Sequence, residues 1–201
     1  AKLLNLNVKI HGNIPDISGG LIVSNHLGYM DIVAHGTIFP VRFTSTVAIS
    51  KCPFIGPFID ASRAILVNRT STPASRQASR DFAKTMKKDI YLIVYPEGTS
   101  TAGKNGILPF KSTSFDAVVT SNMPVLPIIT RYREVPGRET VCWYGDMTLM
   151  PHLWRTLGYS QIDVELHLLD PILPEGRSRK DLAEFVHGVM EKAYQDLPEM
   201  K

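Results

Sequence analysis

The feature that most restricts the fold is an unbroken apolar run at residues 91–95, Tyr-Leu-Ile-Val-Tyr. A strand that is apolar on both faces must be covered on both faces, as in a parallel sheet between two layers of helices. We therefore predict that this run is a central strand. Further short apolar runs alternate with helical patterns, and no repeat or linker divides the chain. We predict one domain over residues 1–201, of class α/β, a mixed, largely parallel sheet with helices on both faces.

Hydrophobic periodicity and turn residues predict the other elements. Strands are expected at 4–10, 21–24, 41–48, 65–67, 124–130, 141–144 and 164–169, and helices at 29–39 and 74–89. The last helix should begin at Ser178, which forms a capping-box-like start with Asp181. Its apolar stripe is expected to be core and consists of Leu182, Phe185, Val186, Val189, Met190, Ala193 and Tyr194.

His26 lies where the strand at 21–24 gives way to the helix at 29–39, and Asp31 falls in the first helical turn. Five residues along a continuous helix turn through about 500°, so the two side chains would then face different ways. If the first of these residues form a loop, the carboxylate can fold back onto the imidazole, fix its tautomer and leave the second ring nitrogen free to take a proton. That is the makeup of a general base. Taken alone, the spacing also fits a structural role at a helix start.

Other polar residues follow apolar strands, at the end where open α/β sheets bind ligands. Arg69 offers a guanidinium that suits a phosphate or carboxylate. Gly98 permits close backbone approach and Thr99 supplies a hydroxyl. Glu97 is expected to accept a hydrogen bond from a substrate or to pair with Arg69, and Lys111 brings a second cation. Each of these residues alone also fits an ordinary turn or surface position.

Charge and cysteine content exclude several classes of protein. The chain has 22 Lys plus Arg and 19 Asp plus Glu, a surplus of +3 that is too small to indicate nucleic-acid binding. Its two cysteines, Cys52 and Cys142, show no metal-ligand spacing, so we expect no metal, no disulfide scaffold and a reducing compartment. No apolar run approaches the roughly 20 residues that span a bilayer. Because the sequence starts at Ala1 rather than Met, a membrane anchor upstream is left open.

In order along the chain, these residues resemble a known family, the glycerolipid acyltransferases typified by 1-acyl-glycerol-3-phosphate acyltransferase. Four blocks carry the resemblance, at residues 25–31, 56–69, 95–99 and 124–127. The resemblance covers about residues 5–170. The His-four-residues-Asp block together with Pro-Glu-Gly-Thr is a highly specific pair.

The resemblance implies that an acyl chain moves from acyl-CoA or acyl carrier protein to the free hydroxyl of a lysolipid, with 1-acyl-glycerol-3-phosphate as the first candidate. It implies that His26 deprotonates this hydroxyl, that Asp31 orients the imidazole, and that no acyl-enzyme and no cofactor are needed. The acceptor-binding residues are expected to be Arg69, Glu97, Gly98, Thr99 and Lys111.

Two departures from the family pattern bear on the acceptor. Ser100 stands where an arginine usually follows Gly-Thr, and residues 45–47 replace lysines that many relatives carry. A zwitterionic acceptor such as lyso-ornithine lipid is therefore a serious alternative. A thioesterase that uses the same base, and a non-catalytic lipid-binding domain, are alternatives from other classes.

A lipid substrate predicts contact with a membrane surface. Arg76, Arg80, Lys84 and Lys88 recur every four residues, and residues 53–59 are unusually apolar for a loop. A basic stripe beside an apolar one suits anionic lipid, although a solvated basic face fits equally well. We expect the protein at the cytoplasmic face of a membrane, either peripheral or anchored by a segment outside this sequence.

Overall fold

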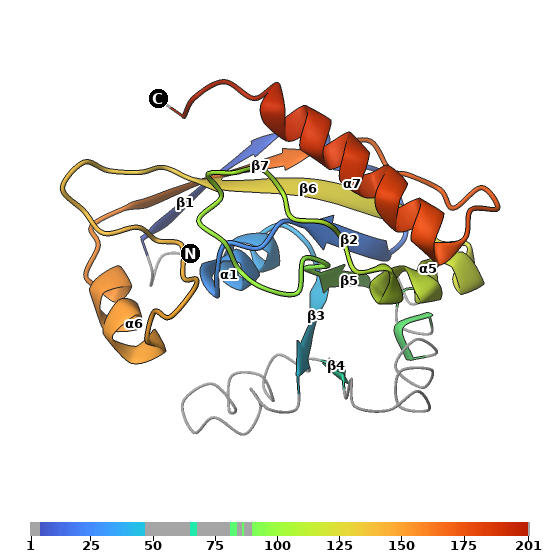
Figure 1. Cartoon of the computed structure of the whole chain (residues 1–201), viewed down its shortest axis with the longest axis horizontal. Coiled ribbons are helices and arrows are strands. Elements are labelled where there is room, and N and C mark those ends of the chain that lie inside the picture. Colours follow the sequence, from blue (N-terminus) through green and yellow to red (C-terminus); the bar gives the residue numbers. More distant parts are fainter. Residues whose placement is uncertain (1–4, 47–64, 68–80, 84–85, 87–89, 201) are drawn as a thin grey trace.

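The computed structural model describes residues 5–46, 65–67, 81–83, 86 and 90–200. Within these residues, seven strands form one sheet in the order β1-β7-β6-β2-β5-β3-β4 (Figure 1). They are β1 (Leu6–His11), β2 (Gly20–Ser24), β3 (Val41–Thr46), β4 (Ile65–Val67), β5 (Tyr91–Val94), β6 (Val125–Tyr132) and β7 (Ile162–Leu168). Neighbouring strands are parallel, except that β6 and β7 are antiparallel. The predicted mixed, largely parallel sheet is confirmed.

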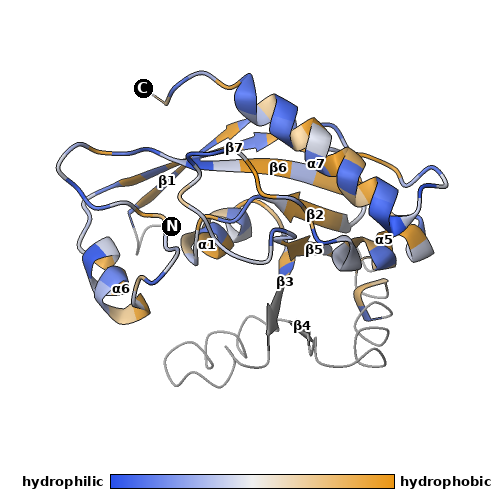
Figure 2. Cartoon of the chain, in the orientation of Figure 1, coloured by the Kyte–Doolittle hydropathy of each residue, from blue (hydrophilic) through white to orange (hydrophobic). Residues whose placement is uncertain are grey.

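Helices cover both faces of this sheet, also as predicted. The described helices are α1 (Met30–Gly36), α5 (Asp116–Ser121), α6 (Leu149–Leu157) and α7 (Arg179–Gln195), with a short 3-10 turn η2 (Ser112–Phe115). On one face, Met30 and Ala34 of α1 pack with Ile22 and other sheet residues. On the other face, α5 and α7 pack with Val23 and its neighbours. Figure 2 shows the hydrophobic residues gathered in the middle strands and hydrophilic ones on the outer side of α7.

The run at 91–95 is apolar because β5 lies inside the sheet, between β2 and β3. Tyr91 and Ile93 join the hydrophobic cluster on the α1 face, whereas Leu92 and Val94 join the cluster on the α7 face. All four residues are buried, so no position in β5 is open to a polar side chain.

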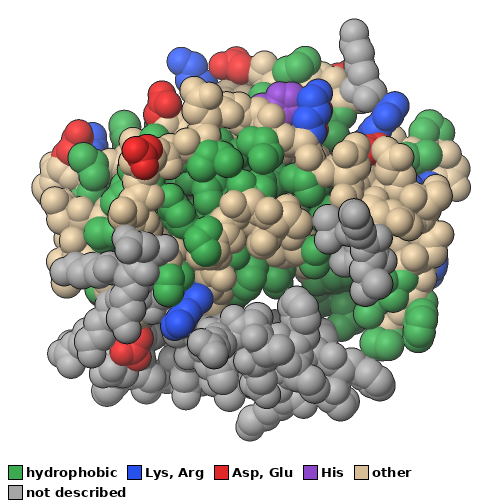
Figure 3. All heavy atoms as spheres, turned by 180° about the vertical axis from the view of Figure 1, so that it is seen from behind, with side chains coloured by type: hydrophobic (Ala, Val, Ile, Leu, Met, Phe, Trp, Pro, Cys, Tyr) green, Lys and Arg blue, Asp and Glu red, His purple; other side chains and the backbone are tan. Residues whose placement is uncertain are grey.

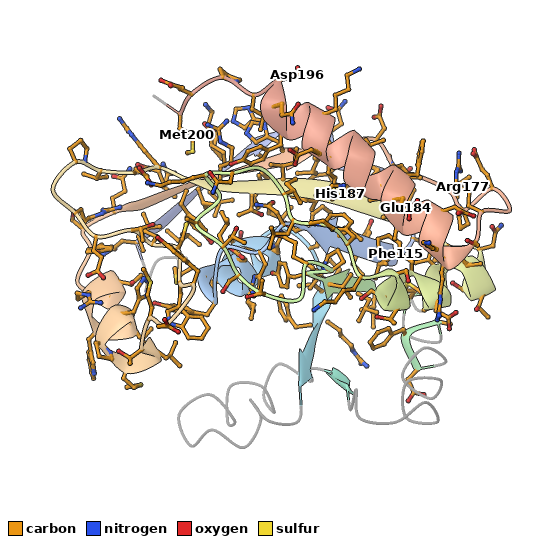
Figure 4. The ribbon with its side chains drawn as sticks, viewed as in Figure 1. Phe115, Arg177, Glu184, His187, Asp196 and Met200 are labelled. Atoms are coloured by element: carbon orange, nitrogen blue, oxygen red, sulfur yellow. The ribbon has the colours of Figure 1, made fainter. Side chains whose placement is uncertain are left out.

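The last helix begins at the predicted cap, where the Ser178 hydroxyl oxygen accepts a hydrogen bond from the Asp181 backbone N–H at 3.3 Å. Leu182 and Met190 of the predicted stripe are fully buried. The prediction that the whole stripe is core is wrong at Phe185, which is 43% exposed. Its ring packs against the Arg177 guanidinium at 4.3 Å, near the start of α7 (Figure 4).

Two parts of the chain differ from the sequence prediction. Residues 141–144 form no strand; Val141 and Cys142 are buried, and the Trp143 N–H donates to the Leu27 carbonyl at 2.8 Å instead of to a sheet partner. The second difference is the helix α6, which is not among the elements predicted from the sequence.

Several predictions fall on residues outside the described ranges. Of the helix expected at 74–89, the described residues 81–83 and 86 are helical. The basic stripe, the apolar loop at 53–59 and Arg69 lie outside the described residues. Within the described part of the chain, no helix is long and apolar enough to span a bilayer.

Candidate active site

The His26 loop, residues 25–31, leaves β2 at the carboxyl end of the sheet and leads into α1. Asn25 continues the pairing of β2 with β6 through its side chain: the amide nitrogen donates to the Thr130 carbonyl at 3.0 Å, and the amide oxygen accepts from the Thr130 N–H at 2.8 Å. The His26 carbonyl accepts from the Thr101 N–H at 2.9 Å. Hydrogen bonds from two other segments therefore fix the backbone around His26.

The Asp31 carboxylate folds back onto the imidazole, as the sequence predicts. Nδ1 of His26 lies 2.8 Å from Oδ2 of Asp31, and the same oxygen accepts the N–H groups of Leu27 at 2.7 Å and Gly28 at 3.1 Å. Because a carboxylate accepts, Nδ1 carries the hydrogen, and Nε2 keeps its lone pair for a proton. Asp31 is fully buried, while the His26 side chain is 24% exposed.

Gly28 is needed for this geometry. Its φ of +149° lies where side chains are disfavoured, and a Cβ would come within 2.9 Å of the Trp143 nitrogen. Glycine thus lets the segment at 141–144 pack against the His26 loop while the Gly28 N–H points at Asp31.

The other carboxylate oxygen is held by a tyrosine that the sequence did not indicate. The Tyr132 hydroxyl donates to Oδ1 of Asp31 at 3.0 Å. Burial, and then the Asp31 charge, raise the pKa of Tyr132 well above its usual value, which keeps this donor protonated. The signal that could have found Tyr132 is its place at the carboxyl end of β6, the same end of the sheet that carries His26.

A second histidine supports the helical side of the loop. His35 is fully buried, and its Nδ1 donates to the Asp31 backbone carbonyl at 2.7 Å. Its Nε2 therefore accepts, from the Thr130 hydroxyl at 3.2 Å, and that hydroxyl lies 2.9 Å from the Ser24 hydroxyl. Burial lowers the pKa of His35, against the opposing effect of Asp31, so the ring is neutral.

Tyr95 contacts both histidines. Its ring stacks on His26 with centroids 4.2 Å apart and planes inclined by 19°, and its hydroxyl lies 3.3 Å from Nδ1 of His35. Stacking on the ring face and the carboxylate at Nδ1 restrict the orientation of the His26 ring.

Glu97 braces the backbone of this site. Its Oε1 accepts from the His26 backbone N–H at 2.7 Å, and its Oε2 accepts from the Leu108 N–H at 3.1 Å. The residue is 5% exposed. Burial raises the pKa of Glu97, and the two backbone hydrogen bonds oppose this rise. The sequence predicted contact with the acceptor or with Arg69, but not this positioning of His26.

The structure brings Gly98, Thr99 and Lys111 together near Glu97. Gly98 has φ +75°, and a Cβ at this position would collide with the Lys111 ammonium, so glycine permits the close approach of that cation. The Lys111 N–H donates to the Pro96 carbonyl at 2.9 Å. Gly98, Thr99 and Lys111 are all exposed and open to a ligand.

Cys142 lies close to this site and is not suited to nucleophilic chemistry. It is a free, buried cysteine, and burial raises its pKa to about 11. A thiol with this pKa stays protonated at neutral pH, whereas nucleophilic cysteines need the thiolate.

At the carboxyl end of the buried strand β2, the structure thus combines an imidazole held by a carboxylate with a neighbouring Pro-Glu-Gly-Thr turn, an arrangement suited to an enzyme that moves a proton. The chain belongs to the Acyltransferase family, whose model matches residues 5–131.

Similar proteins agree with this class. The chain is 28% identical over 198 residues to the lyso-ornithine lipid O-acyltransferase of Brucella abortus, covering 91% of this chain and 74% of that one. It is 24% identical over 165 residues to the 1-acyl-sn-glycerol-3-phosphate acyltransferase of Neisseria gonorrhoeae, covering 81% of this chain and 64% of that one.

The fold also matches a solved structure. The crystal structure of the 1-acyl-sn-glycerophosphate acyltransferase PlsC from Thermotoga maritima superposes with a TM-score of 0.67 and 24% identity, covering 98% of this chain and 76% of that one. The chain thus spans about two thirds to three quarters of the length of these relatives.

Proposed function

We propose that this acyltransferase moves an acyl chain from a thioester, acyl-CoA or acyl carrier protein, to the free hydroxyl of a lysolipid at a membrane surface. The observation that carries the proposal is the His26 imidazole, held at Nδ1 by Asp31 with Nε2 left to accept a proton.

In the proposed reaction, Nε2 of His26 takes the proton of the acceptor hydroxyl as its oxygen attacks the thioester carbonyl carbon. The C–O bond forms, the C–S bond breaks, and the thiolate that leaves receives the proton from Nε2. Asp31 stabilises the imidazolium that exists between these two proton transfers. The buried Cys142 thiol supports direct transfer rather than transfer through that residue.

For the acceptor, we propose that the head group lies over Gly98, Thr99 and Lys111, with Arg69 as a further contact. Exposure of the three described residues beside the His26 loop supports this. Residues 45–47 contain no lysine, and Ser100 rather than an arginine follows the turn. The site therefore has fewer cations than a phosphomonoester acceptor is expected to need. Together with the similarity to lyso-ornithine lipid acyltransferases, this favours a zwitterionic acceptor, with 1-acyl-glycerol-3-phosphate as the second candidate.

The test is a panel of lysolipids assayed separately with acyl-CoA and acyl carrier protein, with the acylated product identified by mass spectrometry. We expect acceptor-dependent release of the thiol and an acylated lysolipid, fastest with the lyso-ornithine lipid. Fastest turnover of 1-acyl-glycerol-3-phosphate would overturn the choice of acceptor. Thiol release that does not depend on the acceptor would instead indicate a thioesterase. No turnover with any combination of acyl donor and lysolipid would indicate a lipid-binding domain.

The exposed apolar surface of helix α6 supports the proposal that the protein acts at a membrane. Its inward residues are polar: His152 and Thr156 are buried, and His152 Nδ1 lies 2.9 Å from the hydroxyl of Tyr29 in the His26 loop. Its apolar residues point the other way, with Trp154 69% exposed and Leu157 41% exposed. Met150 and Leu153 complete an i, i+3, i+4, i+7 stripe on the outside of the helix.

An outward stripe with a tryptophan suits the boundary between lipid head groups and acyl chains. We propose that α6 docks on the cytoplasmic face of the membrane and brings the catalytic end of the sheet toward its lipid substrate. Hydrophobic side chains also gather near the middle of one face of the molecule (Figure 3), which supports peripheral association.

We expect Trp154→Ala to reduce cosedimentation with phosphatidylglycerol vesicles severalfold, because the most exposed apolar side chain of the stripe is lost. The matched control is Phe185→Ala, which removes an exposed aromatic ring from α7 and should bind vesicles like the parent protein. Equal vesicle binding by the parent and Trp154→Ala would contradict the role of α6.

A further inference from the structure

One face of the edge strand β1 and its neighbour β7 carries a cluster of three ligand-type side chains, His11, Glu165 and His167. His11 and His167 are directly paired in the parallel register of β1 and β7, and Glu165 lies two residues before His167. Residues two apart on a strand share a face, so the three side chains project on the same side of the sheet. No sequence spacing reveals this cluster, because its two histidines are distant along the chain.

The three side chains direct their donor atoms to one place. Nε2 of His11 lies 3.4 Å from Oε1 of Glu165, and Nε2 of His167 lies 3.3 Å from Oε2. One donor atom from each residue lies within 4.8 Å of the others. Nε2 of His11 is buried and, within the described part of the chain, makes no hydrogen bond.

We propose that His11, Glu165 and His167 bind a divalent transition-metal ion of the Zn²⁺ type. Two imidazoles and one carboxylate form a ligand set typical of Zn²⁺, with water as the fourth ligand. Tetrahedral bonds of about 2.1 Å set neighbouring ligand atoms roughly 3.4 Å apart, close to the two distances from Glu165.

The arrangement of the rings defines what must move when the ion binds. The imidazoles stack with centroids 4.3 Å apart and planes inclined by 6°, so their Nε2 atoms lie side by side. Metal binding would release the hydrogen that Nε2 of His167 donates to Glu165, and a rotation of each ring would then point both nitrogens at one ion.

A lysine competes with the ion for Glu165. The Lys9 ammonium lies 3.5 Å from Oε1 of Glu165 and pairs with that oxygen. We therefore expect Lys9→Ala to tighten binding of the metal, since it frees the carboxylate without removing a ligand.

Binding would connect the N-terminal strand β1 to β7 through side chains as well as through the backbone. The ion would therefore stabilise the edge of the sheet away from the His26 loop. Metal binding at this site does not depend on acyl transfer, so this proposal stands independently of the proposed function.

The test is calorimetric titration of the tag-free, chelator-treated full chain with Zn²⁺ at neutral pH. We expect one site, at least tenfold weaker binding for His11→Gln and for His167→Gln, and a higher melting temperature of the parent protein with Zn²⁺. The control variant His187→Gln removes a histidine of α7 (Figure 4) that donates to the Ile107 carbonyl, and it should bind Zn²⁺ like the parent.

Histidine NMR of the parent protein provides a readout that does not depend on any variant folding. Zn²⁺ should shift the ring signals of His11 and His167 and leave those of His35 and His187 in place. Absence of binding by the parent, shifts confined to other histidines, or equal affinity of the parent and His11→Gln would each overturn the proposal.

Discussion

His26 and His35 both contact Tyr95 and Asp31, but their surroundings differ. His26 is partly exposed, and among the described residues its ring bonds only through Nδ1, to the Asp31 carboxylate. His35 is fully buried and uses both nitrogens, toward the Asp31 carbonyl and the Thr130 hydroxyl. We therefore propose that His26 acts as a base, whereas the His35 side chain holds the surrounding backbone in place. What separates the two roles is an unused nitrogen within reach of solvent.

The largest expected effect tests the first half of this comparison. His26→Ala should lower kcat on the order of 10²–10⁴-fold, the usual contribution of a positioned general base. The measurement is steady-state turnover of thioester and lysolipid, with circular dichroism as the control for folding. A folded variant that keeps a tenth of the parental turnover would remove His26 from the mechanism.

A smaller effect is expected where Asp31 is held. Tyr132→Phe removes the hydrogen bond to Oδ1 and lets the carboxylate turn away from His26, so kcat should fall about tenfold, or about 1.4 kcal/mol in the barrier. KM for the acceptor should change little, because the tyrosine contacts Asp31 rather than the proposed acceptor residues. An unchanged kcat, or a loss confined to KM, would show that this hydrogen bond does not position the base.

The smallest effect concerns His35 and appears in stability. Its folded pKa lies below the ordinary 6.5, so the unfolded chain binds the proton more readily. The stabilisation is therefore complete above about pH 6.5 and is lost as the pH falls below it, at up to about 1.4 kcal/mol per pH unit. Urea unfolding from pH 7.5 to 5.0 should show a shallower decline for His35→Gln than for the parent protein. Parallel declines in the two proteins would mean that folding does not lower the pKa of His35.

The sheet could be predicted from the sequence because its inner strand β5 leaves no place for a polar residue. Tyr91 to Val94 alternate between two cores, and this alone indicates cover on both faces. Helix α6 could not be predicted in the same way. Periodicity reports that a helix has an apolar side but not where that side points, and in α6 it points outward. Phe185 of α7 shows the same limit at a single position.

In the candidate site, the contact between His26 and Asp31 was predictable because both residues lie in one short loop. Tyr132 ends β6 and Glu97 lies in the turn after β5, and only the packing of β6 and β5 beside β2 brings them to the loop. The role of Glu97 was also hidden because its partners are backbone N–H groups, which every residue carries. The proposed roles of Gly98, Thr99 and Lys111 stay predictions until an acceptor is tested.

The pairing of β1 with β7 sets the order in which the strands of the sheet can pair during folding. Asn7 reaches its neighbour Asp163 only across 156 positions of sequence. During synthesis β1 must wait, unpaired, until β7 has emerged, and contacts between residues so far apart in sequence form slowly. The catalytic half of the sheet, β2 with β5, needs far less of the chain and can assemble while translation continues.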